Sequence, residues 1–151
     1  MSSSVSAATG YRVENPATGE IVERFDTATD EQIGQVIDEA QAAYLKWREK
    51  SIEDRAAIVN KVAALFGERK EELAKIIAEE MGKPIPEGIE EAEFCEAIFN
   101  YYADNGAEFG ADGEIPNKRG GTSIMRKVPL GVIVGIMPWN FPYYQVARFA
   151  A

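Results

Sequence analysis

The sequence has 151 residues, a length typical of about one domain, and 16 Lys and Arg against 25 Asp and Glu give it a formal net charge of −9. The absence of histidine excludes Ser-His and Cys-His nucleophile pairs and histidine-ligated metal sites, and the single cysteine, Cys95, excludes internal disulfides and fits a reducing compartment. The acidic chain has no basic block, which argues against a nucleic-acid partner, since phosphate contacts need clustered Lys and Arg.

The first ten residues predict a disordered tail. They are small, polar and uncharged, and they lack the basic start and the apolar stretch of a signal peptide. The longest apolar run, residues 130–138, is far shorter than the roughly 20 residues that span a bilayer. We therefore expect a cytoplasmic protein with no membrane partner, whose folded part covers residues 11–151.

Residues 11–26 predict a β-hairpin. Two short β-prone runs flank residues 15–19, Asn-Pro-Ala-Thr-Gly, in which the proline and the glycine supply the torsions of a turn. A helix then begins at Thr29, because Thr29 and Gln32 have the spacing of a capping box. Apolar residues recur at three- and four-residue intervals up to Trp47, which gives this helix one apolar face.

Three further helices follow. Ser51 is the expected cap of the second, Gly67 interrupts the pattern, and a third helix continues to Met81. Residues 81–84, Met-Gly-Lys-Pro, are a strong stop, because a glycine at the helix end precedes a proline. A fourth helix is expected over residues 86–109.

After residue 110 the pattern changes to loops and strands. Gly113, Pro116, Gly120 and Gly121 indicate loops, and residues 122–128 look like a partly exposed strand. Residues 131–137 (GVIVGIM) are a continuous β-branched run, typical of a strand buried on both faces in a parallel sheet. The fold class is therefore α/β, and because one parallel strand needs further strands beside it, the domain looks incomplete.

Asn140 is the candidate catalytic residue. It follows the strand predicted at residues 131–137, and ligands collect beyond the carboxyl ends of such strands. Pro138 and Pro142 restrict the backbone on either side, which would hold the carboxamide in one direction, as an oxyanion donor requires. The alternative is that Asn140 caps the next helix and Trp139 belongs to the core, and spacing alone favours this alternative.

The string over residues 131–142, GVIVGIMPWNFP, resembles the aldehyde dehydrogenase superfamily, in which a strand leads into a Pro-Trp-Asn-Phe-Pro loop. The similarity covers residues 11–151 and implies the N-terminal part of such a domain, ending in the first strand of a Rossmann-like dinucleotide-binding sheet. Other features agree in order: NPATGE at residues 15–20, Trp47, Arg55, and MGKP at residues 81–84.

The resemblance implies an NAD- or NADP-dependent oxidation of an aldehyde to an acid. By this likeness the carboxamide of Asn140 donates a hydrogen bond to the oxyanion of a thiohemiacetal. Ile136, Met137, Pro138 and Trp139 would line the nicotinamide-ribose side of the cofactor site. Family members assemble as dimers or tetramers, so a homo-oligomer is expected, with the first hairpin and residues 122–128 as candidate contacts.

Arg148 is the candidate substrate-binding residue. It shares a helix face with Tyr144, four residues earlier. The string PWNFPYYQVARFAA resembles bacterial members that act on succinate semialdehyde, in which an arginine at this place binds the distal carboxylate. A guanidinium can form a bidentate contact with a carboxylate. The alternative is a solvent-exposed arginine or one paired with a surface acid.

The sequence departs from the family pattern in its catalytic residues. The nucleophilic cysteine and the general-base glutamate of the family lie well after the Pro-Trp-Asn loop, and no residues follow Ala151. Cys95 is no substitute, because it sits in a helical pattern near Glu93 and Glu96, which disfavour a thiolate. We therefore expect a buried, inert thiol, a truncated sequence, and no dehydrogenase activity from residues 1–151 alone.

Two interpretations of the acidic helices remain. Seven glutamates form a solvated face rather than a metal site, because metal sites need converging oxygens. A non-catalytic, acidic helical module that binds a partner is the alternative function. The apolar C-terminal segment argues against the module, since it needs further strands beside it and predicts a poorly soluble isolated chain. The glutamates are Glu79, Glu80, Glu87, Glu90, Glu91, Glu93 and Glu96.

Overall fold

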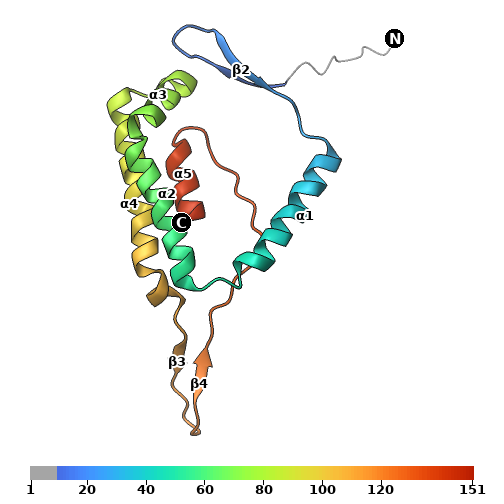
Figure 1. Cartoon of the computed structure of the whole chain (residues 1–151), viewed down its shortest axis with the longest axis vertical. Coiled ribbons are helices and arrows are strands. Elements are labelled where there is room, and N and C mark those ends of the chain that lie inside the picture. Colours follow the sequence, from blue (N-terminus) through green and yellow to red (C-terminus); the bar gives the residue numbers. More distant parts are fainter. Residues whose placement is uncertain (1–9) are drawn as a thin grey trace.

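The computed structural model describes residues 10–151 as helices and two small hairpins, in the order β1-β2-α1-α2-α3-α4-β3-β4-α5 (Figure 1). The tail expected at residues 1–10 lies, except for Gly10, outside the described residues. Within the described part, no helix combines the length and the apolarity needed to cross a bilayer.

The first hairpin is confirmed. β1 (Tyr11–Glu14) pairs antiparallel with β2 (Ile21–Phe25). The turn is held by Asn15, whose Oδ1 accepts a hydrogen bond of 2.9 Å from the backbone N–H of Ala17. Gly19 has a φ of 74°, in the left-handed region that a residue with a side chain rarely adopts.

Helix α1 (Asp30–Trp47) begins as its sequence predicts. The Gln32 N–H donates to Thr29 Oγ1 over 3.2 Å, and the Thr29 N–H donates to Gln32 Oε1 over 2.9 Å, which completes the capping box. Ile33, Val36 and Ile37 on its apolar face are nevertheless exposed. The helix stands apart from the other helices, so none of its residues is buried (Figure 1).

The core lies among the remaining helices. α2 (Ile52–Glu68) and α3 (Lys70–Met81) both pack on the long α4 (Ile85–Gly110), and the short α5 (Pro142–Ala150) packs on α4 as well (Figure 1). The predicted stop is confirmed, because α3 ends at Gly82, which has a φ of 75°. The buried residues at the centre are Ala63, Cys95, Phe99 and Ala147, and the Phe66 and Phe99 rings stack with centroids 5.5 Å apart.

The second hairpin joins β3 (Gly113–Ile115) to β4 (Ser123–Met125) in antiparallel register. A strand within residues 122–128 is thus confirmed in a short form. The prediction of a loop at Gly113 is wrong, because Gly113 begins β3. Three residues that include a glycine are too few to show the alternation that identifies a strand.

Residues 131–137 are in no helix or strand, and the prediction of a buried strand there is wrong. Val134 is 85% exposed and Ile136 is 91% exposed. The reason is that a strand satisfies its backbone N–H and C=O groups through a neighbouring strand, and the four strands of the described residues pair only as β1–β2 and β3–β4, so none lies beside this segment. The α/β class is confirmed, while the segment meant to begin the larger sheet lies unpaired on the surface.

Candidate functional site

The loop over residues 138–142 leads directly into α5. Trp139 and Asn140 form its turn, and both are exposed, with Trp139 at 76%. The residue that caps α5 is Phe141, and no side chain closes this helix end from within the loop. The alternative interpretations, in which Asn140 is a helix cap and Trp139 a core residue, are therefore wrong. The Asn140 carboxamide is free of a capping role.

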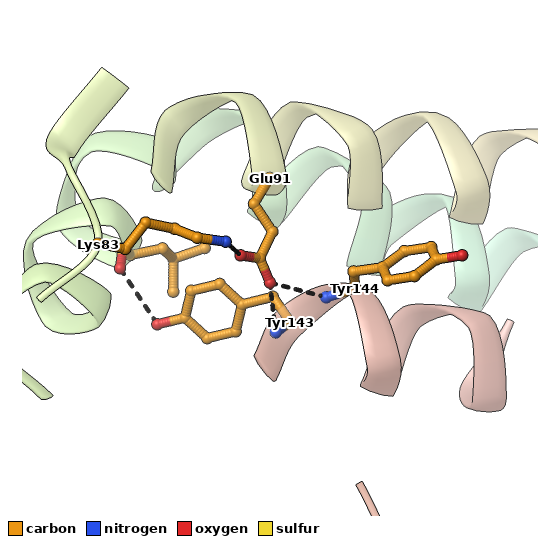
Figure 2. Close-up of polar contacts among 5 residues, drawn as sticks. Lys83, Glu91, Tyr143 and Tyr144 are labelled. Carbon is orange, nitrogen blue, oxygen red and sulfur yellow. Dashed lines mark hydrogen bonds and ion pairs between the residues drawn. The ribbon is translucent and has the colours of Figure 1, made fainter. Parts of the chain in front are cut away.

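Instead, the N-terminus of α5 is capped from another helix. Glu91 Oε1, from α4, accepts the backbone N–H of Tyr143 over 2.8 Å and that of Tyr144 over 3.1 Å (Figure 2). Pro142 occupies the first helical position and has no N–H, so these are the first two N–H groups that the helix offers. A carboxylate here also interacts favourably with the positive end of the helix dipole.

Lys83 completes this arrangement. Its ammonium donates to Glu91 Oε2 over 2.5 Å, and both side chains are buried (Figure 2). The same Nζ lies 3.6 Å from the centroid of the Phe141 ring, a cation–π contact. The Met-Gly-Lys-Pro segment after α3 and the loop before α5 thus meet through Lys83, although almost sixty residues of sequence separate them.

Glu91 is the functional residue that the sequence prediction missed. The prediction of a solvated acidic face is wrong for Glu91, because this residue is only 2% exposed. A signal was present in the spacing, because Glu91 falls three residues after Gly88 and four before Cys95, both buried on α4. Across the described residues, no group of three or more His, Cys, Asp and Glu side chains is placed to hold a metal ion.

Tyr143 also links α5 to α3 through a hydrogen bond. Its hydroxyl donates to the backbone carbonyl of Leu73 over 3.3 Å, and its ring packs edge-on against Phe66. Burial, together with the carboxylates of Glu80, Glu91 and Glu72, raises the pKa of Tyr143 to about 12, and Arg69 opposes this. The hydroxyl therefore stays protonated and acts as a hydrogen-bond donor.

A cleft of about 570 Å³ opens beside the loop. Its lining includes Lys83, Glu91, Phe94 and Phe141, so it combines aromatic surface with the buried ion pair. The ring of Tyr144 stacks on Phe94 with centroids 5.4 Å apart and meets Phe141 edge-on at 5.7 Å. The loop is thus backed by an aromatic cluster.

Arg148 is exposed on α5, one turn after Tyr144. Its guanidinium carbon lies 5.7 Å from the centroid of the Tyr144 ring, which confirms that the two side chains share a face. The position leaves the guanidinium hydrogen-bond donors accessible to a ligand.

The four residues predicted to contact a cofactor lie immediately before the turn and in its first position. Ile136, Pro138 and Trp139 are exposed and Met137 is half-buried. Residues 136–138 lie in no helix or strand, so their backbone groups are not committed to secondary structure and can contact a flat ring or a ribose.

Cys95 is buried in the helical core, as predicted. Burial first, and then the Glu91 carboxylate, raise the pKa of its thiol to about 12, while Lys83 acts in the opposite direction. The carboxylate that matters is therefore Glu91, rather than the sequence neighbours Glu93 and Glu96. A thiol with this pKa is protonated at neutral pH and is a poor nucleophile.

Comparison with known proteins gives a consistent result. The aldehyde dehydrogenase family matches residues 3–151. The succinate-semialdehyde dehydrogenase (NADP+) of Deinococcus radiodurans is 42% identical over 141 residues, which are 93% of this chain and 29% of that protein. Succinate-semialdehyde dehydrogenase (NADP+) 1 of Mycobacterium tuberculosis is 39% identical over 139 residues, 91% of this chain and 30% of that protein.

The same portion is found in solved structures. The crystal structure of succinic semialdehyde dehydrogenase from Streptococcus pyogenes, in complex with NADP+, superposes with a TM-score of 0.87 at 34% identity, over 91% of this chain and 30% of that one. The chain thus spans about 30% of the length of the relatives that it matches.

Proposed function

The chain belongs to the aldehyde dehydrogenase family, and from that premise we propose that it forms the N-terminal part of an enzyme that oxidises succinate semialdehyde to succinate with NADP+. The observation that carries the proposal is the 42% identity to a succinate-semialdehyde dehydrogenase (NADP+) over 141 residues, 93% of this chain. The names of the relatives favour NADP+ over NAD+. Family membership also favours an enzyme over a non-catalytic helical module.

The reaction consumes the aldehyde, one water and NADP+, and yields the carboxylate, NADPH and two protons. When bound, the nicotinamide cofactor supplies the hydride acceptor. Residues 136–139 would hold its nicotinamide-ribose side, because they present exposed apolar side chains and uncommitted backbone groups. This chain's contribution is to bind and orient the reacting groups.

Asn140 is the proposed oxyanion donor. Its carboxamide would donate a hydrogen bond to the carbonyl oxygen as that oxygen gains negative charge. Its exposed position and its freedom from a capping role support this assignment. In an enzyme that contains this chain, Asn140→Ala should lower kcat by about 10²–10³-fold, the usual cost of one oxyanion donor, with little change in KM. An unchanged kcat would refute the role.

Arg148 is the proposed clamp for the distal carboxylate of the substrate. In the same enzyme, Arg148→Ala should raise KM far more for succinate semialdehyde than for an uncharged aldehyde of similar length, and Arg148→Lys should restore only part of the loss because lysine lacks the planar fork. Steady-state kinetics with both aldehydes provides the measurement. An equal rise in KM for both substrates would contradict the clamp.

Residues 1–151 alone should be inactive. Their single cysteine is Cys95, whose buried thiol is protonated, so they offer no nucleophile for the aldehyde. The absorbance of NADPH, followed with the purified chain, NADP+ and succinate semialdehyde, should not rise. Any turnover above that of a denatured control would contradict this.

The complete enzyme is expected to be a cytoplasmic homodimer or tetramer, with β1–β2 and β4 as candidate contacts.

A further inference from the structure

The buried pair of Lys83 and Glu91 divides its hydrogen bonds between two parts of the molecule. One carboxylate oxygen of Glu91 accepts the ammonium of Lys83, and the other accepts the amides of Tyr143 and Tyr144 (Figure 2). Three donors therefore converge on one carboxylate that is 2% exposed. Such a buried charge is stable only while its partners stay in place, so the positions of the three donors can change little.

These contacts end within a few residues of Asn140. Two backbone amides on a single oxygen fix both the position and the rotation of the first turn of α5, and this turn begins directly after the loop. Phe141, the residue next to Asn140, also makes the cation–π contact with Lys83. The backbone that carries the Asn140 carboxamide is thus anchored by groups outside the loop.

We propose that Glu91, together with Lys83, is a positioning residue that sets the direction of the Asn140 carboxamide through the N-terminus of α5. This rests on the proposed function of Asn140. A donor aimed at a developing oxyanion must be fixed before the reaction, and a displacement of about 1 Å costs as much as a hundredfold in rate. The ion pair supplies this fixation without contacting the substrate.

Glu91→Gln is the diagnostic substitution, because it keeps the size of the side chain. A glutamine amide has one acceptor oxygen and a donor NH₂ group, so it cannot accept from Lys83 and from both α5 amides at once. Glu90→Gln, one residue earlier on the same helix and exposed, is the matched control. Lys83→Met combined with Glu91→Gln removes both charges, so no unpaired ammonium is left buried.

The first experiment measures the mobility of the loop around Asn140 in this chain. The chain has two tryptophans, so Trp47→Phe leaves Trp139, the neighbour of Asn140, as the single reporter. In that background Glu91→Gln should increase the rotational mobility of Trp139 in fluorescence anisotropy decay. It should also reduce hydrogen-exchange protection at the Tyr143 and Tyr144 amides, while α2 and α4 keep theirs. In the double variant no ammonium competes for the glutamine oxygen, which can then accept both α5 amides, so stability and part of the amide protection should recover. Glu90→Gln should change neither Trp139 mobility nor protection.

The second experiment measures kcat and KM in an enzyme that contains this chain. Glu91→Gln should lower kcat by about 10–100-fold while KM changes little, because a displaced donor weakens only the transition state. In an Asn140→Ala background the same substitution should have almost no further effect, since its target is already absent.

The two failures are distinguishable. If Asn140→Ala leaves kcat unchanged, the proposed function of Asn140 fails, whatever Glu91 does. Positioning by Glu91 is overturned if Trp139 mobility and the protection of the two amides are unaffected by Glu91→Gln. It is also overturned if the kcat losses of Glu91→Gln and Asn140→Ala multiply, which would show that the residues act independently.

Discussion

Cys95 packs with Ala63, Phe99 and Ala147, and its thiol is closed off from solvent. The pKa of about 12, against an ordinary value of 9.0, makes the thiolate fraction at neutral pH about a thousandfold smaller than in an unhindered thiol. Iodoacetamide should therefore modify the folded chain at least that much more slowly than the chain unfolded in guanidinium. Mass spectrometry of the alkylated protein measures both rates, and equal rates would show that the core opens readily.

The same shift makes stability depend on alkaline pH. Because the folded state holds the Cys95 proton up to about pH 12, whereas an unfolded thiol loses it near pH 9, the unfolded state binds fewer protons between these values. The contribution of Cys95 to the free energy of unfolding should therefore be constant below about pH 9 and fall above it. Tyr143, whose pKa is raised as well, adds to this fall. In Cys95→Ala the decline measured by urea denaturation should be shallower; an unchanged slope would contradict the assignment.

The sequence indicates that Cys95 is inert but does not show that Glu91 is buried, and the difference has a physical origin. An isolated cysteine in an apolar helical pattern is buried by default. A glutamate in the same pattern is buried only if a cation and further donors surround it, and here the donors come from Lys83 and from a helix that begins some fifty residues later. The helical spacing places Glu91 on the buried face of α4, but the partners that surround it are brought together by the fold and cannot be identified from its sequence neighbours.

The packing of α3 against α4 depends on a glycine. A Cβ atom at Gly88 would lie 2.9 Å from the Cα and 3.0 Å from the Cβ of Ala74 on α3. Gly88→Ala must therefore push the helices apart, and it should lower the free energy of unfolding by about 1–3 kcal/mol. Chemical denaturation followed by circular dichroism gives the value.

Gly34 is the matched control for this effect. It lies within α1, and a Cβ atom there would meet nothing within 4 Å. Gly34→Ala should stabilise α1 by about 0.5–1 kcal/mol, because alanine loses less backbone entropy in a helix. Amide hydrogen exchange in α1 provides the readout. If both substitutions destabilise alike, close packing is not what requires glycine at position 88.

The ends and turns of elements are predicted correctly where they depend on residues close together in the sequence. The turn at Asn15, the capping box at Thr29 and the stop at Gly82 each depend on interactions within a few residues, and all three form as expected. The segment at residues 131–137 shows the opposite case. Its composition favours a strand, but a strand also requires a partner, and composition does not determine whether one is within reach.

The unpaired segment and α1 leave much apolar surface open to solvent. Val134 and Ile136 are almost fully exposed, as is Leu130 nearby. Contiguous apolar surface of this kind promotes self-association. The chain should therefore form soluble aggregates at increasing concentration, detected by light scattering after size-exclusion chromatography.

A charge at this segment should suppress the association. Val134→Lys combined with Ile136→Lys should return the chain to a monomer, because lysines in an exposed β-prone segment oppose pairing between molecules. The control is Thr27→Lys combined with Thr122→Lys, which adds the same two charges at exposed positions outside this segment. If both pairs act equally, net charge rather than the apolar segment governs association.

The separation between Glu91 and the amides that it accepts has a consequence for biosynthesis. Tyr143 follows Glu91 by 52 residues, so a ribosome that adds about 5–20 residues per second delivers it roughly 3–10 s later. Lys83, eight residues upstream of Glu91, has been made before either. Lys83 and Glu91 can therefore form their salt bridge on the nascent chain first. Helix α5 is translated later and then packs against this preformed pair.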